Sequence, residues 1–230
     1  MAKHSKRFAK LKQTVEGIEP QTVDSAVKKL KGFVTTKFDQ SVEVAVRLGI
    51  DPKQADQGVR GSVNLPHNIG KSVRVAVFAQ GDRADAAKKA GADVVGAEDL
   101  AEKIKGGFAD FDVCLASTDM MKVVGPLGRV LGPKGLMPTP KTGTMVDMNT
   151  DLANVVTEFK AGKVEFRADA TGIVHALVGK LSLPDDQLAA NIEAFINHMR
   201  SVKPAAVKGQ YIRSITISAT MSPGVPIIAA

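Results

Sequence analysis

Alternating apolar and polar positions mark both ends of the chain. Residues 42–48, VEVAVRL, follow the two-residue period of a strand that buries one face. Three later segments behave in the same way: 163–168, 172–179 and 211–219. The tetrapeptide DATG between the first two of these is a hairpin signal that ends in glycine. The two ends of the chain are therefore predicted to contain antiparallel strands.

The segment 184–202 follows a different period. Its sequence, PDDQLAANIEAFINHMRSV, repeats apolar residues every three or four positions, which is typical of a helix with one buried face. The residues on that face are Ile192, Phe195, Ile196 and Met199. Together with the strands, this helix predicts an α+β arrangement.

The middle of the chain alternates strands with helices. Apolar runs that predict strands lie at 73–79, 93–96, 111–118 and 143–146. Helices are predicted between them, at 82–92, 98–105 and 120–131, the last of them capped by Asp119. A strand–helix–strand order predicts a parallel sheet covered by helices, as in a small Rossmann-like unit.

Neither end of the chain has enough apolar surface to form a domain by itself. Residues 1–67 and 159–230 are therefore predicted to fold together, with residues 68–158 inserted as a second domain. The predicted fold class is α/β, with a split α+β domain of antiparallel strands and an inserted Rossmann-like α/β domain.

Charge is divided unequally between the two predicted domains. The chain has a net charge of +7. The inserted domain has 11 Lys and Arg against 12 Asp and Glu, whereas the split domain has 20 against 12. A solvated charged face is the simplest interpretation, but confinement of the excess to one domain favours a polyanionic partner.

Nothing in the sequence indicates a membrane or secreted protein. No apolar run approaches the roughly 20 residues that cross a bilayer. The basic segment MAKHSKRFAKLK lacks the apolar stretch of a secretory signal. Cys114 is the single cysteine, and its apolar neighbours predict a buried structural thiol. The expected setting is the reducing cytoplasm.

The sequence patterns of nucleotide sites are incomplete. The turn after the first strand of the inserted domain reads VFAQGDRADAA, with one glycine and the acidic Asp82 in place of G-x-G-x-x-G. The segment 68–72, NIGKS, ends like a phosphate loop, but Leu65 stands where the earlier glycine is required. We therefore expect no nucleotide cofactor.

Metal sites and catalytic pairs are not indicated either. The histidines are scattered without metal-ligand spacing: His4, His67, His175 and His198. His175 falls on an alternating strand and is interpreted as structural. No convincing nucleophile–base pair is found, so we expect no metal and no enzymatic activity.

A glycine- and proline-rich segment runs from Gly125 to Lys141. Its sequence, GPLGRVLGPKGLMPTPK, has four glycines, four prolines, three basic residues and no acid. It lacks the Lys-Ser/Thr ending of a phosphate loop. A rigid structural connection and a direct contact with RNA or tRNA both stay open, and nucleotide binding is the weakest alternative.

The last predicted strand carries a row of hydroxyl groups. With a period of two, one face presents Ser214, Thr216, Ser218 and Thr220. Such a row can bond to phosphates and 2′-hydroxyls, although exposed strands are often rich in Ser and Thr. Lys37 and Phe38, a cation and a ring, precede the first strand. With few aromatic residues in the chain, recognition of folded RNA by shape fits better than stacking on single strands.

These residues belong to segments that resemble a known family. The chain is similar over essentially its whole length to the bacterial large-subunit ribosomal proteins of the mobile stalk beside the tRNA exit site, the proteins numbered one in that subunit. Four blocks carry the resemblance: SVEVAVRLGIDPKQADQGVRGSVNLPHNIGK, LGRVLGPKGLMPTPKTGT, GKVEFRADATGIVHALVGK and KPAAVKGQYIRSITISATMSPGV.

The resemblance implies a function without catalysis. It implies that the split domain binds a folded junction of 23S rRNA, and that the stalk helps to release deacylated tRNA from the exit site. It also implies repression of translation through the protein's own operon mRNA, and action as a single copy within the ribosome. The family's RNA-contact positions fall here on Lys37, Phe38, Glu43, Arg167, Ser214, Thr220 and Met221. The next position, usually glycine in the family, is Ser222.

Two other classes of function are weighed against this one. An enzyme could use the Rossmann-like domain for a nucleotide or small substrate, although the glycine fingerprint is missing. A basic protein could also coat nucleic acid without specificity, in which case any duplex would bind equally well.

Overall fold

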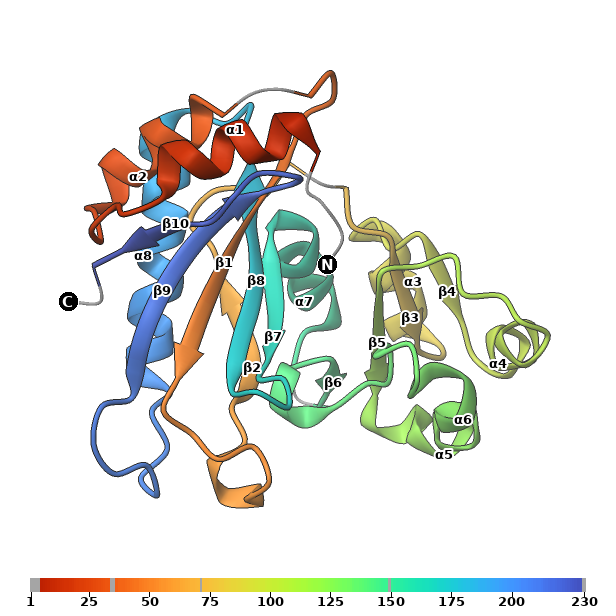
Figure 1. The fold of residues 1–230 in the computed structure, drawn as a ribbon. Coiled ribbons are helices and arrows are strands. Elements are labelled where there is room, and N and C mark those ends of the chain that lie inside the picture. Colours follow the sequence, from red (N-terminus) through yellow and green to blue (C-terminus); the bar gives the residue numbers. More distant parts are fainter. Residues whose placement is uncertain (1–4, 34–35, 71, 149, 229–230) are drawn as a thin grey trace. The chain divides into compact units, whose positions relative to one another are not determined.

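The chain folds as two compact units (Figure 1). The computed structural model describes residues 5–33, 36–70, 72–148 and 150–228. Unit 1 comprises Met1–Lys71 and Val164–Ala230, and unit 2 comprises Ser72–Lys163. That each unit folds independently of the other stays a prediction.

Unit 1 is built on an antiparallel sheet with the strand order β10-β9-β1-β8. Its strands are β1 (Ser41–Leu48), β8 (Ile173–Lys180), β9 (Ile212–Ala219) and β10 (Val225–Ile227). The central pairs are antiparallel, with Ala45 opposite both His175 and Thr216. A second, two-stranded sheet is formed by β2 (Arg60–Asn64) and β7 (Lys163–Arg167). The antiparallel strands predicted at 42–48, 172–179 and 211–219 are confirmed. The segment 163–168 also forms a strand, but the hairpin predicted through DATG is not extended: β7 pairs with β2 and, among the described residues, meets β8 only at the bridge between Ala168 and Val174.

Helices cover one face of the four-stranded sheet. They are α2 (Val23–Lys31) and α8 (Asp185–Ser201), whose apolar residues pack on the strands. The first helix, α1 (Lys6–Val15), has no buried residue and lies by the turn after β9, where Arg7 donates to Met221 O at 3.2 Å. A 3₁₀ turn, η1 (Ala55–Gln57), lies between β1 and β2. The apolar face predicted for the last helix is buried, with Phe195 fully enclosed. It shares one core with the inward residues of the strands, such as Val44 and Ile217. The burial of alternate residues leaves the other face of the sheet for polar side chains.

Unit 2 is a parallel sheet between two layers of helices. Its strand order is β4-β3-β5-β6, formed by β4 (Val94–Gly96), β3 (Val75–Phe78), β5 (Val113–Ser117) and β6 (Met145–Val146). One layer holds α3 (Asp82–Lys89) and α7 (Leu152–Ala161). The other holds α4 (Glu98–Lys105), α5 (Met121–Val124) and α6 (Gly128–Leu131). The predicted α/β fold class is therefore confirmed.

The helix predicted at 120–131 is broken, so that prediction was wrong in form. A 3₁₀ turn, η2 (Thr118–Met120), precedes α5, and a second one, η3 (Gly125–Leu127), separates α5 from α6. Ser117, not Asp119, precedes the first turn. Pro126 has no N–H to donate and glycine is a poor helix former, so a continuous helix is disfavoured.

Helix α7 was not predicted, although its signals are present. The Asp151 side chain accepts a hydrogen bond from Ala153 N at 3.0 Å, and Gly162 ends the helix with a φ of 125°. Its apolar residues recur at helical spacing and are buried: Leu152, Val155, Val156 and Phe159. An N-cap, a helical period and a final glycine together indicate a helix.

No helix among the described residues is both long and apolar enough to span a membrane.

Candidate RNA-binding surface

Polar side chains gather on the sheet face that the helices leave uncovered. In the register of β1 with β9, Glu43 lies opposite Ser218 and Arg47 opposite Ser214. His175 of β8 lies across from Ala45. We call this surface the open face; its residues are Glu43, Ala45, Arg47, His175, Ser214, Thr216 and Ser218. The predicted row of hydroxyls is present here, because the alternate residues of β9 are buried.

One end of the open face is closed by the turn after β9. Thr220 N donates to Ser41 O at 3.0 Å, and the Thr220 hydroxyl accepts from Ser41 N at 3.2 Å. Met221 follows with a side chain that is 60% exposed and a φ of 64°. A positive φ is costly for a residue with a side chain. The turn therefore presents an apolar side chain to solvent on a constrained backbone.

Ser222 completes this turn without needing the conformation of glycine. Among the described non-glycine residues only Met221 has a positive φ, so Ser222 has a backbone that any residue can adopt. Ser222 N donates to Ala219 O at 2.9 Å, and the Ser222 hydroxyl accepts from Ala219 N at 2.9 Å. The serine thus ties the turn to the end of β9.

Lys37 and Phe38 lie at the same end of the sheet, just before β1 begins. Both are exposed, Phe38 to 51%. The backbone there is anchored by Gln40, which is 2% exposed and whose Nε2 donates to Thr36 Oγ1 at 2.8 Å. We call this end the turn end, made of Lys37, Phe38, Ser41, Thr220, Met221 and Ser222.

Arg167 is the last residue of β7, in the two-stranded sheet, and a hairpin-like turn leads from it to β8. The hairpin is held by an antiparallel bridge between Ala168 and Val174. The Asp169 carboxylate accepts hydrogen bonds from Ile173 N and Thr171 N, and these bonds lower its pKa. Arg167 is exposed and lies between the inward-facing Phe166 and Ala168. Its side chain therefore belongs on the side of the open face.

All the sequence-predicted contact residues thus lie along one surface of unit 1. From Thr220 to Ser214 the strand covers six residues, or roughly 20 Å. Glu43 stands between these two ends. The basic side chains of the open face, Arg47 and His175, were not among the predicted contacts. Alternation along β1 could have pointed to Arg47, whereas the place of His175 depends on pairing between distant strands.

The charge of the two units agrees with this location. Relative to the predicted boundaries, the units move Lys71 into unit 1 and Lys160 and Lys163 into unit 2. Unit 2 is then neutral, and the whole net charge of +7 resides in unit 1. Attraction of a polyanion is consequently a property of the unit that carries the open face.

The segment from Gly125 to Lys141 takes part in the core of unit 2. Leu127 and Leu131 are fully buried, and Leu136 packs against the same core. After η4 (Pro140–Thr142), the Thr144 hydroxyl accepts from Thr139 N at 2.9 Å and closes the loop. The basic side chains of the segment are exposed: Arg129, Lys134 and Lys141. The apolar residues of this segment therefore have a structural role in the core of unit 2.

The sheet edge where open α/β folds usually bind ligands is filled by an arginine in unit 2. Ligands of such folds bind at the carboxyl ends of the strands. There, Arg83 donates to Ser117 Oγ at 2.8 Å and to the carbonyls of Asp147 and Thr150 at 2.9 and 2.7 Å. These bonds tie α3 to the end of β5 and to the loop after β6. Asp82 begins α3 beside them, which disfavours a phosphate.

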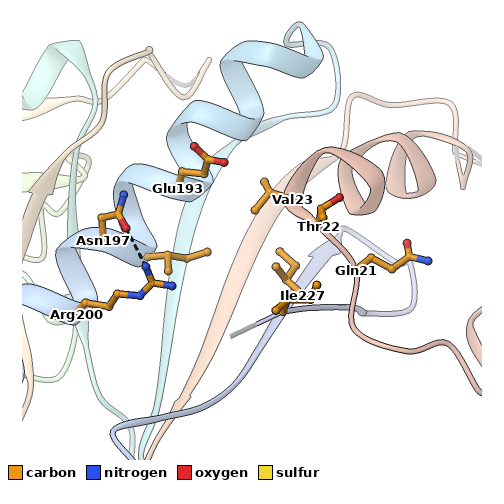
Figure 2. A pocket seen from close by; sticks show the side chains of 9 residues that line it. Gln21, Thr22, Val23, Glu193, Asn197, Arg200 and Ile227 are labelled. Carbon is orange, nitrogen blue, oxygen red and sulfur yellow. Dashed lines mark hydrogen bonds between the residues drawn. The ribbon is translucent and has the colours of Figure 1, made fainter. Parts of the chain in front are cut away.

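A pocket of about 340 Å³ lies on the helix-covered side of unit 1 (Figure 2). It is bordered by α8, by the start of α2 and by the end of β10. Figure 2 shows Asn197 and Arg200 joined by a hydrogen bond of 3.3 Å at one side of it. It is separate from the open face, because the sheet lies between them. In the part of the chain that the structure describes, no group of acidic, His and Cys side chains could hold a metal ion.

Comparison with known proteins shows the family. The sequence profile of the "Ribosomal protein L1p/L10e family" matches residues 27–223. The "Large ribosomal subunit protein uL1" of Cupriavidus pinatubonensis (strain JMP 134 / LMG 1197) is 52% identical over 227 residues, covering 99% of this chain and 97% of the relative. The protein of the same name from Marinomonas sp. (strain MWYL1) is 51% identical over 227 residues, covering 99% and 96%. The resemblance drawn from the sequence is confirmed: the chain belongs to the ribosomal protein L1 family, whose members are structural proteins of the ribosome and not enzymes.

Proposed function

We propose that this protein is a structural constituent of the large ribosomal subunit that binds a folded junction of 23S rRNA through the open face and the turn end. The observation that carries this proposal is the open face itself. It presents a row of hydroxyls and the exposed Arg47, with the exposed Lys37 at the turn end and the exposed Arg167 beside it, in the unit that holds the entire net charge. Hydroxyls and guanidinium groups are the usual partners of phosphates and 2′-hydroxyls.

The proposed contacts divide by chemistry. Lys37 and Arg167 offer cations to phosphates, while Ser214 and Thr220 offer hydroxyls. Phe38 and Met221 are exposed apolar groups that suit a base or sugar face. Glu43 can accept hydrogen bonds from an amino group of a base or from a 2′-hydroxyl. Ser222 contributes through the turn that supports Met221.

Specificity follows from this mixture. Cations alone would bind any RNA, but an acidic group and exposed apolar groups within the surface favour one folded partner. Specific nucleic-acid complexes are typically about 10³-fold or more tighter than non-specific ones at physiological salt. We therefore expect tight binding to one rRNA junction and weak binding to generic duplex.

Filter binding at fixed salt tests this proposal. The labelled junction RNA is bound by the full-length protein, and unrelated structured RNA is added as competitor. The labelled complex should survive an equimolar amount of unrelated competitor and should be lost in a large excess of unlabelled junction. Equal competition by both RNAs would replace the proposal with non-specific coating of nucleic acid.

The finer roles in the proposal rest on family membership and on the sequence resemblance. They are formation of the mobile stalk, release of deacylated exit-site tRNA, and repression of the protein's own operon mRNA. Crosslinking in cells followed by sequencing of the bound RNA separates these partners. Reads from 23S rRNA, from tRNA and from the operon leader support the three roles independently, and a missing class removes that role alone.

A further inference from the structure

A histidine holds one of the proposed RNA contacts in place. His175 Nδ1 lies 2.9 Å from Glu43 Oε1. Because an ionised carboxylate only accepts hydrogen bonds, the Nδ1–H of the imidazole is the donor. The two side chains are 51% and 47% exposed. The pair therefore lies at the surface, where a binding partner can reach both groups.

The histidine also lies next to a second proposed contact. Arg167 and His175 each lie one residue beyond the bridge between Ala168 and Val174, on the two arms of one hairpin. Both belong to the side of the open face. His175 thus stands between Glu43 on β1 and Arg167 on β7, in the middle of the surface.

The position of the Glu43 carboxylate matters because its negative charge repels the phosphates of an RNA. A carboxylate on a surface that meets phosphates weakens binding unless it accepts a hydrogen bond from the RNA. Such a bond requires a defined carboxylate position, whereas an exposed glutamate samples several rotamers and loses that freedom on binding. The bond to His175 restricts those rotamers before the RNA arrives.

We propose that His175 is a positioning residue that fixes the Glu43 carboxylate for the RNA and thereby contributes to RNA specificity. This inference rests on the proposed function, because it needs the open face to be the RNA-binding surface. It assigns His175 a role beyond that of a structural strand residue. The part of the imidazole that matters is the Nδ1–H group.

Asparagine provides a matched substitution, because its Nδ2 can donate from nearly the same place as Nδ1 of histidine. Three variants are therefore compared: His175→Ala, His175→Asn and Glu43→Gln. His175→Ala should weaken binding to the junction RNA about 3- to 10-fold, the effect of losing one hydrogen bond. His175→Asn should stay within about twofold of the wild type. Affinity for an unrelated duplex should be unchanged in both.

A double variant isolates the coupling between the two side chains. If His175 acts through Glu43, His175→Ala in the Glu43→Gln background should have no further effect on junction binding. Asn197→Ala, on the helix-covered side of unit 1, serves as the control. Unchanged melting temperatures show that all variants are folded.

The results separate this inference from the proposed function. If the wild type does not prefer the junction over competitor RNA, the proposed function fails. If the wild type prefers it, the positioning role is overturned by any of three results: His175→Ala binds like the wild type, His175→Asn loses as much as His175→Ala, or the effects of His175→Ala and Glu43→Gln are additive.

Discussion

At the scale of single residues, a substitution at Met221 should lower RNA affinity without lowering stability. The positive φ of Met221 costs about 1–2 kcal/mol in a residue with a side chain, whereas glycine costs about 0.5–1 kcal/mol in backbone entropy. Met221→Gly should therefore leave the free energy of unfolding unchanged or raise it by up to about 1 kcal/mol. Because the exposed side chain is lost, affinity for the rRNA junction should fall.

Denaturant titration and filter binding measure the two effects of Met221→Gly. Met221→Leu is the matched control, since it keeps an exposed apolar side chain on the same backbone and should retain most of the affinity. An undiminished affinity of Met221→Gly would mean that the Met221 side chain does not contact the RNA.

His198 makes the stability of unit 1 depend on pH. Its ring packs edge-on against Phe166 at 5.5 Å, and burial lowers its pKa. The unfolded chain, with a histidine pKa of about 6.5, binds this proton more readily than the folded chain. Stability should therefore decrease as the pH falls below about 6.5.

In denaturant titrations between pH 5 and 7.5, His198→Gln should lose that part of the pH dependence. An identical dependence in both proteins would assign the effect to other groups.

The sequence allowed part of the candidate site to be predicted at this scale. The hydroxyl row follows from the two-residue period of one strand, so the common face of Ser214 and Thr220 could be predicted. The pair of Glu43 and His175 joins strands 132 residues apart in the chain. Its formation depends on the register of β1 with β8, which a single sequence does not contain.

At the scale of elements, Asn191 fastens β8 and the chain after β2 to helix α8. It is fully buried, and its Nδ2 donates to Val178 O at 2.9 Å and to His67 O at 3.1 Å. Its Oδ1 accepts from His67 N at 3.0 Å. Asn191→Ala leaves these backbone groups without partners and should lower the free energy of unfolding of unit 1 by about 2–4 kcal/mol.

Asn197→Ala is the matched control for this substitution, because Asn197 lies on the same helix with an exposed side chain. It should change the free energy of unfolding by less than about 0.5 kcal/mol. Equal effects of the two variants in a denaturant titration would show that the Asn191 hydrogen bonds are not important for stability.

Predictability at this scale depended on the strength of the local pattern. The alternation of 42–48 and the helical period of 184–202 are strong, and both elements formed as predicted. The segment 120–131 has the period of a helix, but its glycines and proline divide it into short turns. Helix α7 was missed although Asp151 and Gly162 mark its two ends and its apolar residues recur at helical spacing.

At the scale of the whole molecule, the chain leaves unit 1 a few residues after β2 and returns to it at the start of β7. The two strands pair, and Ala168 N donates to Val59 O at 2.9 Å. The start of β2 therefore meets the end of β7, and Asn64 and Lys163 lie at the opposite end of the pair. After β2, Ile69 is still buried in the core of unit 1, and the chain enters unit 2 only beyond it. A linker from Gly70 to Gly162 can thus close unit 1 upon itself.

Unit 1 should consequently bind the rRNA junction without unit 2. A linker of about ten Gly and Ser residues has a root-mean-square span of roughly 17 Å, and lengthening it twofold costs only about 0.6 kcal/mol more. The shortened protein should fold and keep most of the affinity, because phosphate contacts dominate that affinity and the net charge of +7 resides in unit 1.

The isolated 72–163 segment should fold through its own two-sided core but show no specific affinity, since it is neutral. Calorimetry of both proteins against the same RNA measures this division. If the 72–163 segment binds the junction and unit 1 does not, the RNA-binding surface lies instead in the glycine- and proline-rich segment from Gly125 to Lys141 or near it.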